Sequence, residues 1–450
     1  MCYLHFITLW KQLTDRNVSV NQRNNSLILT LCVWFLLTFV GQSVSANNPI
    51  RTASHIHTVQ LHKKGWDLSN PIIQLRGTEQ LTLSFDDFAF DSKNYQYTIV
   101  HCNSDWEFSD LMQTEYVEGF MPNAIEDYQY SFNTLQSYVH YTLDFPNNDI
   151  QLKLSGNYII KVFELGEEAN PVLVRPFWVS ESQVSIIPRV KYTASSSLRQ
   201  TMQQVNFTIL HPNFRIDNAH NDIKVIVQQN GRWDNQIDDL KPLFIRNEEL
   251  AYEYSRENLF DGGNEYRWLD LRSTRFAPEH VEKISFHDPF YHFTLFAEKA
   301  QGSKPYFYRE DFNGKYVIDV REERDPHIEA DYVYAHFTLP VAAPFIDGDV
   351  YVTGGLSDWQ LNKRNKMNYN YESIAYELSL FLKQGFYNYQ YHFLENGKTK
   401  AEVERFEGNF GQSENDYLIY VYYKATSDNY ERLIGVNMSN SLKYSAPGNH

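Results

Sequence analysis

The chain has 450 residues, of which 16 % are aromatic, and its formal net charge is −16. A chain of this length exceeds what one hydrophobic core usually fills, so we expect two to four domains. Aromatic side chains suit half-buried pleated surfaces, and the composition therefore favours an all-β protein built from several β-sandwiches. Because no run of lysine and arginine concentrates positive charge, nucleic acid is a poor candidate for a partner.

Residues 1–46 have the features of a signal peptide. An apolar run over residues 27–40 follows three basic residues and is too short to span a bilayer comfortably. Residues 44–46 (Val-Ser-Ala) form a small-residue cleavage site, which makes Asn47 the expected start of the mature chain. An uncleaved membrane anchor is the alternative. No later apolar run is long enough to cross a membrane, so we expect a soluble mature protein in an exported compartment.

Short apolar runs separated by turn signals predict a first β-sandwich over residues 50–180. Turn signals such as Ser155-Gly156-Asn157 separate the runs. Cys102 is the one cysteine of the expected mature chain, and we expect it to be a buried small apolar residue rather than a reactive thiol. The expected strands cover residues 56–61, 80–85, 95–101, 138–145 and 158–164.

A second β-rich segment is predicted over residues 181–326. Its most specific local feature is Asn230-Gly231, a strong signal for a tight hairpin turn, which follows a β-branched run. The expected strands cover residues 204–210, 223–229, 250–254, 265–269 and 290–296.

A third β-sandwich is predicted over residues 330–436, after a charged stretch at 321–326 that contains proline and is the best linker candidate. Residues 439–450 are polar and contain Ser, Gly and Pro, which predicts a disordered tail. The expected strands of the third sandwich cover residues 332–339, 350–353, 375–382, 387–393 and 417–423.

Pairs of adjacent acidic residues are the first candidates for chemistry. They lack the alternating carboxylates and the glycine turn of a calcium loop. Neighbours on a strand also point to opposite faces, so one ion could not bind both, and we expect solvated turns. The pairs are Asp86-Asp87, Glu167-Glu168 and Asp238-Asp239.

Histidines and nucleophile motifs give no stronger indication of a reaction. His55 and His57 lie on one face of an expected strand, but no partner has the spacing that a zinc site needs, and we expect both to be exposed. The chain has no Gly-x-Ser-x-Gly motif, no phosphate loop and no paired acid and base in a recognisable context. The sequence therefore predicts no cofactor, no metal and no enzyme.

The third segment contains a strand and a Gly-rich turn over residues 348–359, which ends at Trp359. A later strand carries a Gly-x-Tyr-x-Tyr pattern that includes Tyr389. This arrangement resembles the starch- and glycogen-binding modules, which are early-set immunoglobulin-like sandwiches. The resemblance implies that Trp359 and Tyr389 could stack on sugar faces. The alternative is that both side chains close the sandwich core, as they do in modules that bind no glycan.

Several uncommon sequence segments are distributed along the expected mature chain, and the resemblance they carry covers about residues 56–436. They are 105–111 (Asp-Trp-Glu-Phe-Ser-Asp-Leu), 115–120 (Glu-Tyr-Val-Glu-Gly-Phe), 127–134 (Asp-Tyr-Gln-Tyr-Ser-Phe-Asn-Thr), 229–235 (Gln-Asn-Gly-Arg-Trp-Asp-Asn) and 258–265 (Asn-Leu-Phe-Asp-Gly-Gly-Asn-Glu). Together they resemble the plug proteins of the type IX secretion system.

The resemblance implies a non-enzymatic protein of the periplasm. Plug proteins close the periplasmic opening of a very large outer-membrane translocon barrel and keep the membrane sealed while no substrate is exported. The expected partner is therefore that barrel, reached through protein–protein contacts at the outer membrane. The resemblance transfers no contact residues. A periplasmic glycan-binding protein acting through the third segment is the alternative function.

Overall fold

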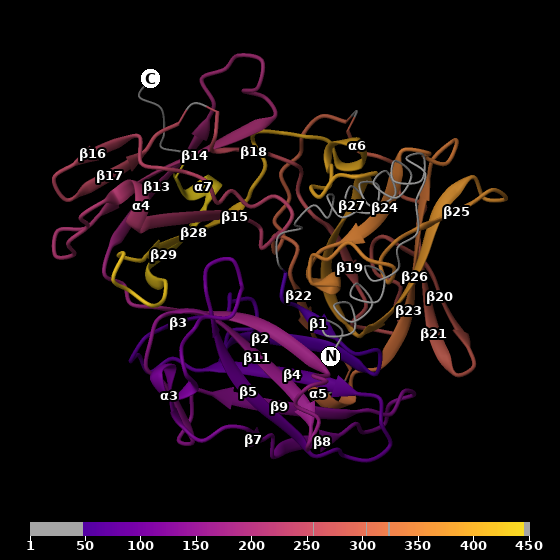
Figure 1. Ribbon diagram of the computed structural model, residues 1–450. Helices are drawn as coiled ribbons and strands as arrows, with labels where there is room; N and C mark the ends of the chain where they lie inside the picture. Colours follow the sequence, from indigo (N-terminus) through magenta and orange to yellow (C-terminus); the bar gives the residue numbers. More distant parts are fainter. Residues whose placement is uncertain (1–47, 255, 303, 323–324, 445–450) are drawn as a thin grey trace, which may run out of the picture. The chain divides into compact units, whose positions relative to one another are not determined.

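The computed structural model describes residues 48–254, 256–302, 304–322 and 325–444. Within these ranges the chain is nearly all β with a few one-turn helices, which confirms the predicted fold class (Figure 1). The predicted signal peptide, residues 1–46, lies outside the described residues. No helix in the described part of the chain is long and apolar enough to cross a membrane.

A first β-sandwich holds two main sheets around one core. Alternation along β4 points Leu81, Leu83 and Phe85 into this core, where they meet Ile160 and Phe177 of the facing sheet. One sheet has the order β1 (Arg51–Thr52), β12 (Leu173–Ser180), β11 (Gly156–Glu164), β5 (Tyr95–Cys102) and β7 (Asn123–Ala124), with β3 (Ile72–Gln74) also on β12. The other has the order β2 (Ile56–Lys63), β4 (Leu81–Asp87), β9 (Val139–Phe145) and β8 (Asp127–Tyr130). A small sheet of β6 (Val117–Gly119) and β10 (Ile150–Leu152) follows the one-turn helix α3 (Gln113–Tyr116).

A second pair of sheets shares another core, in which Phe207 and Val225 are buried with Ile419. One sheet has the order β13 (Ser185–Tyr192), β14 (Met202–Leu210), β17 (Glu249–Tyr252) and β16 (Phe244–Arg246), with β18 (Leu259–Asp261) also on β14. The other has the order β15 (Ile223–Gln229), β28 (Asp416–Tyr423) and β29 (Arg432–Asn440). The one-turn helices of this region are α4 (Ala219–Asp222) and α7 (Ser441–Tyr444).

A third pair of sheets encloses a core that contains Phe337, Val350 and Phe393. One sheet has the order β20 (Val281–His287), β21 (Phe290–Leu295), β23 (Tyr332–Pro340), β26 (Ala375–Lys383) and β25 (Asn368–Asn370). The other has the order β19 (Arg267–Asp270), β27 (Gly385–Glu395) and β22 (Tyr316–Ile318), with β24 (Gly348–Thr353) also on β27. Short helices here are α5 (Pro326–Glu329), η1 (Gly355–Ser357) and α6 (Glu404–Glu407).

The predicted strands agree with the observed ones within two residues at each end, and β15 matches its predicted range of 223–229. The sheets, however, do not follow the predicted boundaries at 326 and 330. β28 pairs with β15, and β29 pairs with β28, while β19 and β21 pair with strands beyond residue 330. Strand alternation and linker composition are local properties, whereas these pairings join distant strands. The division of the chain into independently folding domains stays a prediction.

The predicted disordered tail is wrong for residues 439–444. Ser439 and Asn440 end strand β29, and helix α7 follows them. The Asn440 side-chain amide donates to Glu414 and Asp416, and the Asn415 backbone N–H donates to Ser441 Oγ at 3.0 Å. These hydrogen bonds order a segment whose polar composition alone predicted disorder. Residues 445–450 lie outside the described residues.

Candidate functional site

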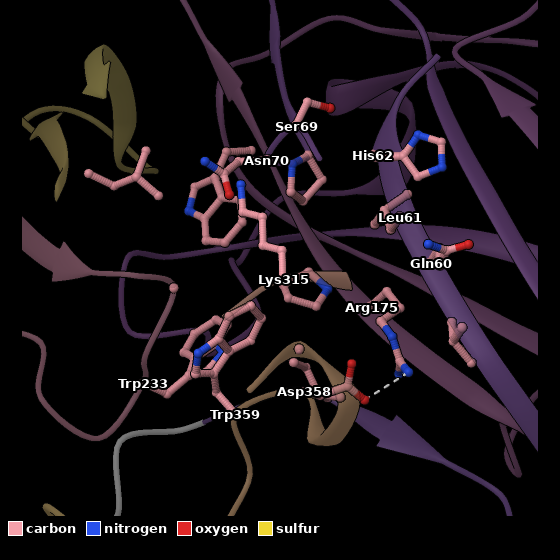
Figure 2. Close-up of a pocket in the computed structure, with 18 of the residues that line it drawn as sticks. Gln60, Leu61, His62, Ser69, Asn70, Arg175, Trp233, Lys315, Asp358 and Trp359 are labelled. Carbon is pink, nitrogen blue, oxygen red and sulfur yellow. Dashed lines mark hydrogen bonds and ion pairs between the residues drawn. The ribbon is translucent and has the colours of Figure 1, made fainter. Parts of the chain in front are cut away.

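A pocket of about 180 Å³ lies where the first sandwich meets strands of the other two pairs of sheets (Figure 2). We call it the junction pocket. Its apolar wall includes Trp178 on β12, Tyr420 on β28 and Trp233 after β15. The rings of Trp178 and Tyr420 stack with centroids 5.2 Å apart. Strands β12 and β28 are buried on both faces, so the side that does not face a sheet core carries aromatic residues that pack against one another.

A tight turn between β15 and Trp233 positions one side of the junction pocket. Asn230 has φ +51° and Gly231 has φ +75°, and the Arg232 backbone N–H donates to the Gln229 carbonyl at 3.0 Å. Two successive positive φ values match the mirror-image hairpin turn predicted from Asn-Gly. A Cβ added to Gly231 would lie 3.7 Å from the Trp359 ring, so the turn and the indole are in contact.

The polar side of the junction pocket contains two cations with different partners. Arg175 on β12 forms an ion pair with Asp358 at 3.1 Å and also donates to the Arg51 carbonyl at 2.9 Å. Lys315 donates to the Leu68 carbonyl at 2.6 Å. Burial raises the pKa of Asp358 and lowers the pKa of Lys315. The pocket therefore combines an aromatic wall with a paired guanidinium and an ammonium group held by a carbonyl.

A second candidate surface is the open edge of the first sandwich, beside strands β7 and β8. Tyr128 and Tyr130 on β8 are opposite Tyr141 and Val139 on β9, so their side chains belong to the core-facing side of the sheet. No further strand continues this sheet beyond β8 among the described residues, and the two tyrosines remain 42 % and 51 % exposed.

Two phenylalanines in loops of the first sandwich are also highly exposed. Phe90 is 91 % exposed in the loop after β4, and the Ser92 backbone N–H of that loop donates to Tyr130 Oη at 3.3 Å. Phe120 is 92 % exposed immediately after β6 and before β7. We call Phe90, Phe120, Tyr128 and Tyr130 the aromatic edge. Large exposed apolar side chains of this kind are typical of binding surfaces.

A buried group of charged residues lies on the opposite face of the β8-containing sheet. Asp86 on β4 accepts from Lys383 Nζ at 2.7 Å, from Tyr332 Oη at 2.6 Å, and is 2.6 Å from His140 Nδ1. Lys383 and Tyr332 belong to the third pair of sheets, on β26 and β23. The expectation that Asp86 and Asp87 are solvated is wrong, because both are fully buried. Their side chains do point to opposite faces, since Asp87 instead accepts from Tyr95 Oη at 2.9 Å. Asp238, Asp239, Glu167 and Glu168 are exposed, as predicted.

The predicted sugar-stacking residues lie in different environments. Tyr389 on β27 is fully buried, and its hydroxyl donates to Glu298 at 2.5 Å, which contradicts a role in stacking on a sugar. Alternation along β27 turns Tyr389 toward the core of the third pair of sheets. Trp359 is half-buried and lines the junction pocket, so a ligand role for it stays a prediction.

The other residues singled out in the sequence are buried or half-buried. Cys102 is fully buried, as predicted. His57 is not exposed: its ring stacks on Phe88 with centroids 3.8 Å apart, and burial lowers its pKa to about 4. His55 is half-buried as well. Among the residues that the structure describes, no three His, Cys, Asp or Glu side chains are grouped closely enough to hold a metal ion. Sequence reasoning missed Lys315 and Arg175, and it named Asp86 without foreseeing its burial, because the main partners of each come from distant parts of the sequence.

Comparisons with known proteins agree with this fold. Residues 56–181, which span the first sandwich and the aromatic edge, match the family described as type 9 secretion system plug protein, first domain. The crystal structure of a hypothetical protein from Parabacteroides merdae is similar, with 38 % sequence identity and a TM-score of 0.84. That match covers 86 % of this chain and 98 % of the other. No curated protein matches. The chain belongs to the plug protein family of the type IX secretion system.

Proposed function

We propose that this protein is a non-enzymatic plug of the periplasm, which closes the periplasmic opening of the type IX outer-membrane translocon through protein–protein contacts. Membership of the plug family assigns the chain a role related to type IX secretion and supports this proposal. The observation that carries the contact itself is the aromatic edge, because it lies within the residues that match the plug domain. Exposed aromatic side chains supply large contact area with little loss of rotamer freedom.

The surroundings of the aromatic edge indicate the chemistry of the partner surface. Asp91, Glu118, Glu126 and Asp127 are exposed within one or two residues of its side chains. Complementary charge on a partner guides association and opposes the binding of like-charged surfaces. We therefore expect the barrel rim to present apolar side chains flanked by lysine or arginine, and the contact to weaken as the salt concentration rises.

Capture from envelope extracts tests this function. The purified protein, immobilised, is expected to recover a very large outer-membrane barrel in mild detergent. Replacing Phe90 and Phe120 together by serine removes two exposed apolar side chains and is expected to lower barrel recovery at least about tenfold. Recovery is measured by quantitative mass spectrometry of the bound fraction.

A matched control separates the aromatic edge from exposed apolar surface in general. Phe307 and Ile346 are 81 % and 95 % exposed outside the first sandwich, and their double serine variant should recover as much barrel as the unchanged protein. Equal loss in both variants, or no barrel recovered by the unchanged protein, would contradict the assignment. A cell that lacks the protein should also admit a large hydrophilic antibiotic through the unsealed barrel, and re-expression should restore resistance.

Glycan binding is less well supported than plugging. Its one remaining feature is Trp359, because Tyr389 has no exposed ring. A sugar site usually needs polar groups that converge around the stacked face, whereas the wall next to Trp359 is formed largely by Trp233, Trp178 and Tyr420. Retardation on a glucan-affinity gel that is lost in Trp359→Ala would favour this function over plugging.

A further inference from the structure

Lys315 places an ammonium group in the wall of the junction pocket without a carboxylate partner. Its Nζ donates to the Leu68 carbonyl at 2.6 Å, and no described residue forms an ion pair with it, although the charge of Asp416 acts on it from farther away. An ammonium group has three donors, so two of them are left for another acceptor. Figure 2 shows the Lys315 side chain extending among the lining residues toward Asn70.

Among the residues that the structure describes, the fully buried arginine and lysine side chains are paired, which sets the half-buried Lys315 apart. Arg175 pairs with Asp358 in the same pocket, Arg232 pairs with Asp234 at 2.7 Å, and Lys383 pairs with Asp86 at 2.7 Å. A cation withdrawn from water costs free energy unless a counter-charge or several hydrogen bonds replace its hydration. An anion bound in the junction pocket would supply that counter-charge to Lys315.

The rest of the junction pocket selects an aromatic or apolar group. Trp178, Trp233 and Tyr420 are at most 9 % exposed, and the half-buried Trp359 lies beside them. The volume of about 180 Å³ is below the roughly 300–1,000 Å³ of pockets that hold drug-sized ligands, so one ring or one side chain is the expected occupant. Aromatic walls favour an aromatic occupant through offset-stacked and edge-to-face contacts.

We propose that the junction pocket binds an aromatic carboxylate, whose ring contacts the half-buried Trp359 and the exposed edges of Trp178 and Trp233, and whose carboxylate pairs with Lys315. Two sources present this chemistry: a free aromatic acid, and the carboxyl-terminal aromatic residue of a peptide. This site is separate from the aromatic edge and does not rest on the proposed function. A carboxylate pairing with an ammonium group inside an apolar pocket forms a short, charge-assisted hydrogen bond.

Binding of matched acids and amides tests the proposal on the unchanged protein. The probes are N-acetyl-phenylalanine, N-acetyl-phenylalaninamide, and a tetrapeptide ending in phenylalanine as the free acid or the amide. Isothermal titration calorimetry with tryptophan fluorescence as a second readout is expected to show that each acid binds at least about tenfold more tightly than its amide. Tighter binding of the peptide acid identifies a chain end as the natural occupant, and tighter binding of the small acid identifies a free metabolite.

A variant of Lys315 assigns the charge preference to this residue. Lys315→Met keeps most of the unbranched side chain and removes the ammonium, so it should weaken binding of the acids by about tenfold and leave binding of the amides unchanged. Lys304→Met, at an exposed position, is the matched control and should change neither. Acids and amides that bind equally, no binding of any probe up to millimolar concentrations, or binding of maltotriose in their place would each overturn the proposal. The comparison of acid with amide needs no variant, so it holds even if Lys315→Met fails to fold.

Discussion

Glu265 is a carboxyl group whose surroundings favour its protonated form. It is 5 % exposed, its Oε1 accepts from Tyr306 and from the Glu414 backbone N–H, and its Oε2 is buried without a hydrogen-bond partner. Burial is the main cause that raises its pKa to about 7, and the nearby charges of Asp311 and Glu414 contribute. Asp311 has its own pKa raised to about 6, mainly by burial. This acidic corner therefore holds protons that exposed carboxyl groups would have released.

The raised pKa of Glu265 predicts how stability changes with pH. Its folded pKa of about 7 lies above the unfolded value of 4.5, so its contribution is fully present below pH 4.5 and is lost as the pH rises to about 7. The glutamine of Glu265→Gln cannot ionise. Relative to the unchanged protein, the free energy of unfolding of this variant should therefore rise by about 3 kcal/mol between pH 4.5 and pH 8. Melting temperatures at pH 5, 6, 7 and 8 measure this. Glu279→Gln, at an exposed site, should show no such trend, and parallel pH profiles for Glu265→Gln would refute the assignment.

At the scale of elements, the contact between strands β4 and β26 depends on one buried ion pair. Asp86 and Lys383 are at most 2 % exposed, and the Lys383 ammonium also lies 4.1 Å from the centre of the Tyr138 ring. The pairing with Lys383 and the hydrogen bond from His140 hold the pKa of Asp86 below its usual value, against the opposing effect of burial. The pair joins the first sandwich to the third pair of sheets, as the Arg175–Asp358 ion pair also does at the junction pocket.

Removing only one charge of the Asp86–Lys383 pair should lower the free energy of unfolding more than removing both charges. Lys383→Met leaves Asp86 buried without its cation and is expected to lower the free energy of unfolding by about 3–5 kcal/mol. In an Asp86→Asn background the same substitution should cost clearly less, because no charge is left behind. Lys366→Met, which breaks an exposed pair with Asp349, is the control and should cost under about 1 kcal/mol. Urea unfolding of the unchanged protein, the two single variants, the double variant and the Lys366→Met control gives the coupling free energy between Asp86 and Lys383. If the two single substitutions lower the free energy of unfolding additively, the ion pair does not couple the two strands.

The same elements show what can be predicted from sequence and what cannot. Strand positions follow from local composition, as in the β-branched run of β15, and the Asn230-Gly231 turn follows from two positive φ values that few residues tolerate. Pairing partners do not follow, because β15 and β28 carry no matching local pattern. The burial of Asp86 could not be foreseen either, since it depends on Lys383 from a distant strand. Trp359 was found through its Gly-rich turn, whereas Lys315 lies in no recognisable motif.

At the scale of the whole molecule, the crossed pairing of strands predicts which fragments can fold. The core of the first sandwich consists of residues between 56 and 179, so a fragment of residues 48–182 should fold alone. A fragment of residues 330–444 should not, because β28 loses β15 and β27 loses β19. Near-ultraviolet circular dichroism and limited proteolysis of both fragments measure this. A cooperative, protease-resistant 330–444 fragment would show that its boundaries define a domain after all.

The strand order around β15 also has a consequence for the timing of folding. Ile223 pairs with Tyr423, so β15 obtains its partner only after the long segment between the two strands has been made. Pairings that span long loops form slowly, because loop-closure entropy must be met before the contact contributes. Until then the β-branched run of β15 presents an unpaired edge, which is the kind of segment that templates aggregation. We therefore expect ribosome-stalled or C-terminally clipped chains to be cleared or to aggregate, and the intact chain to need protection by a chaperone until its last strands arrive.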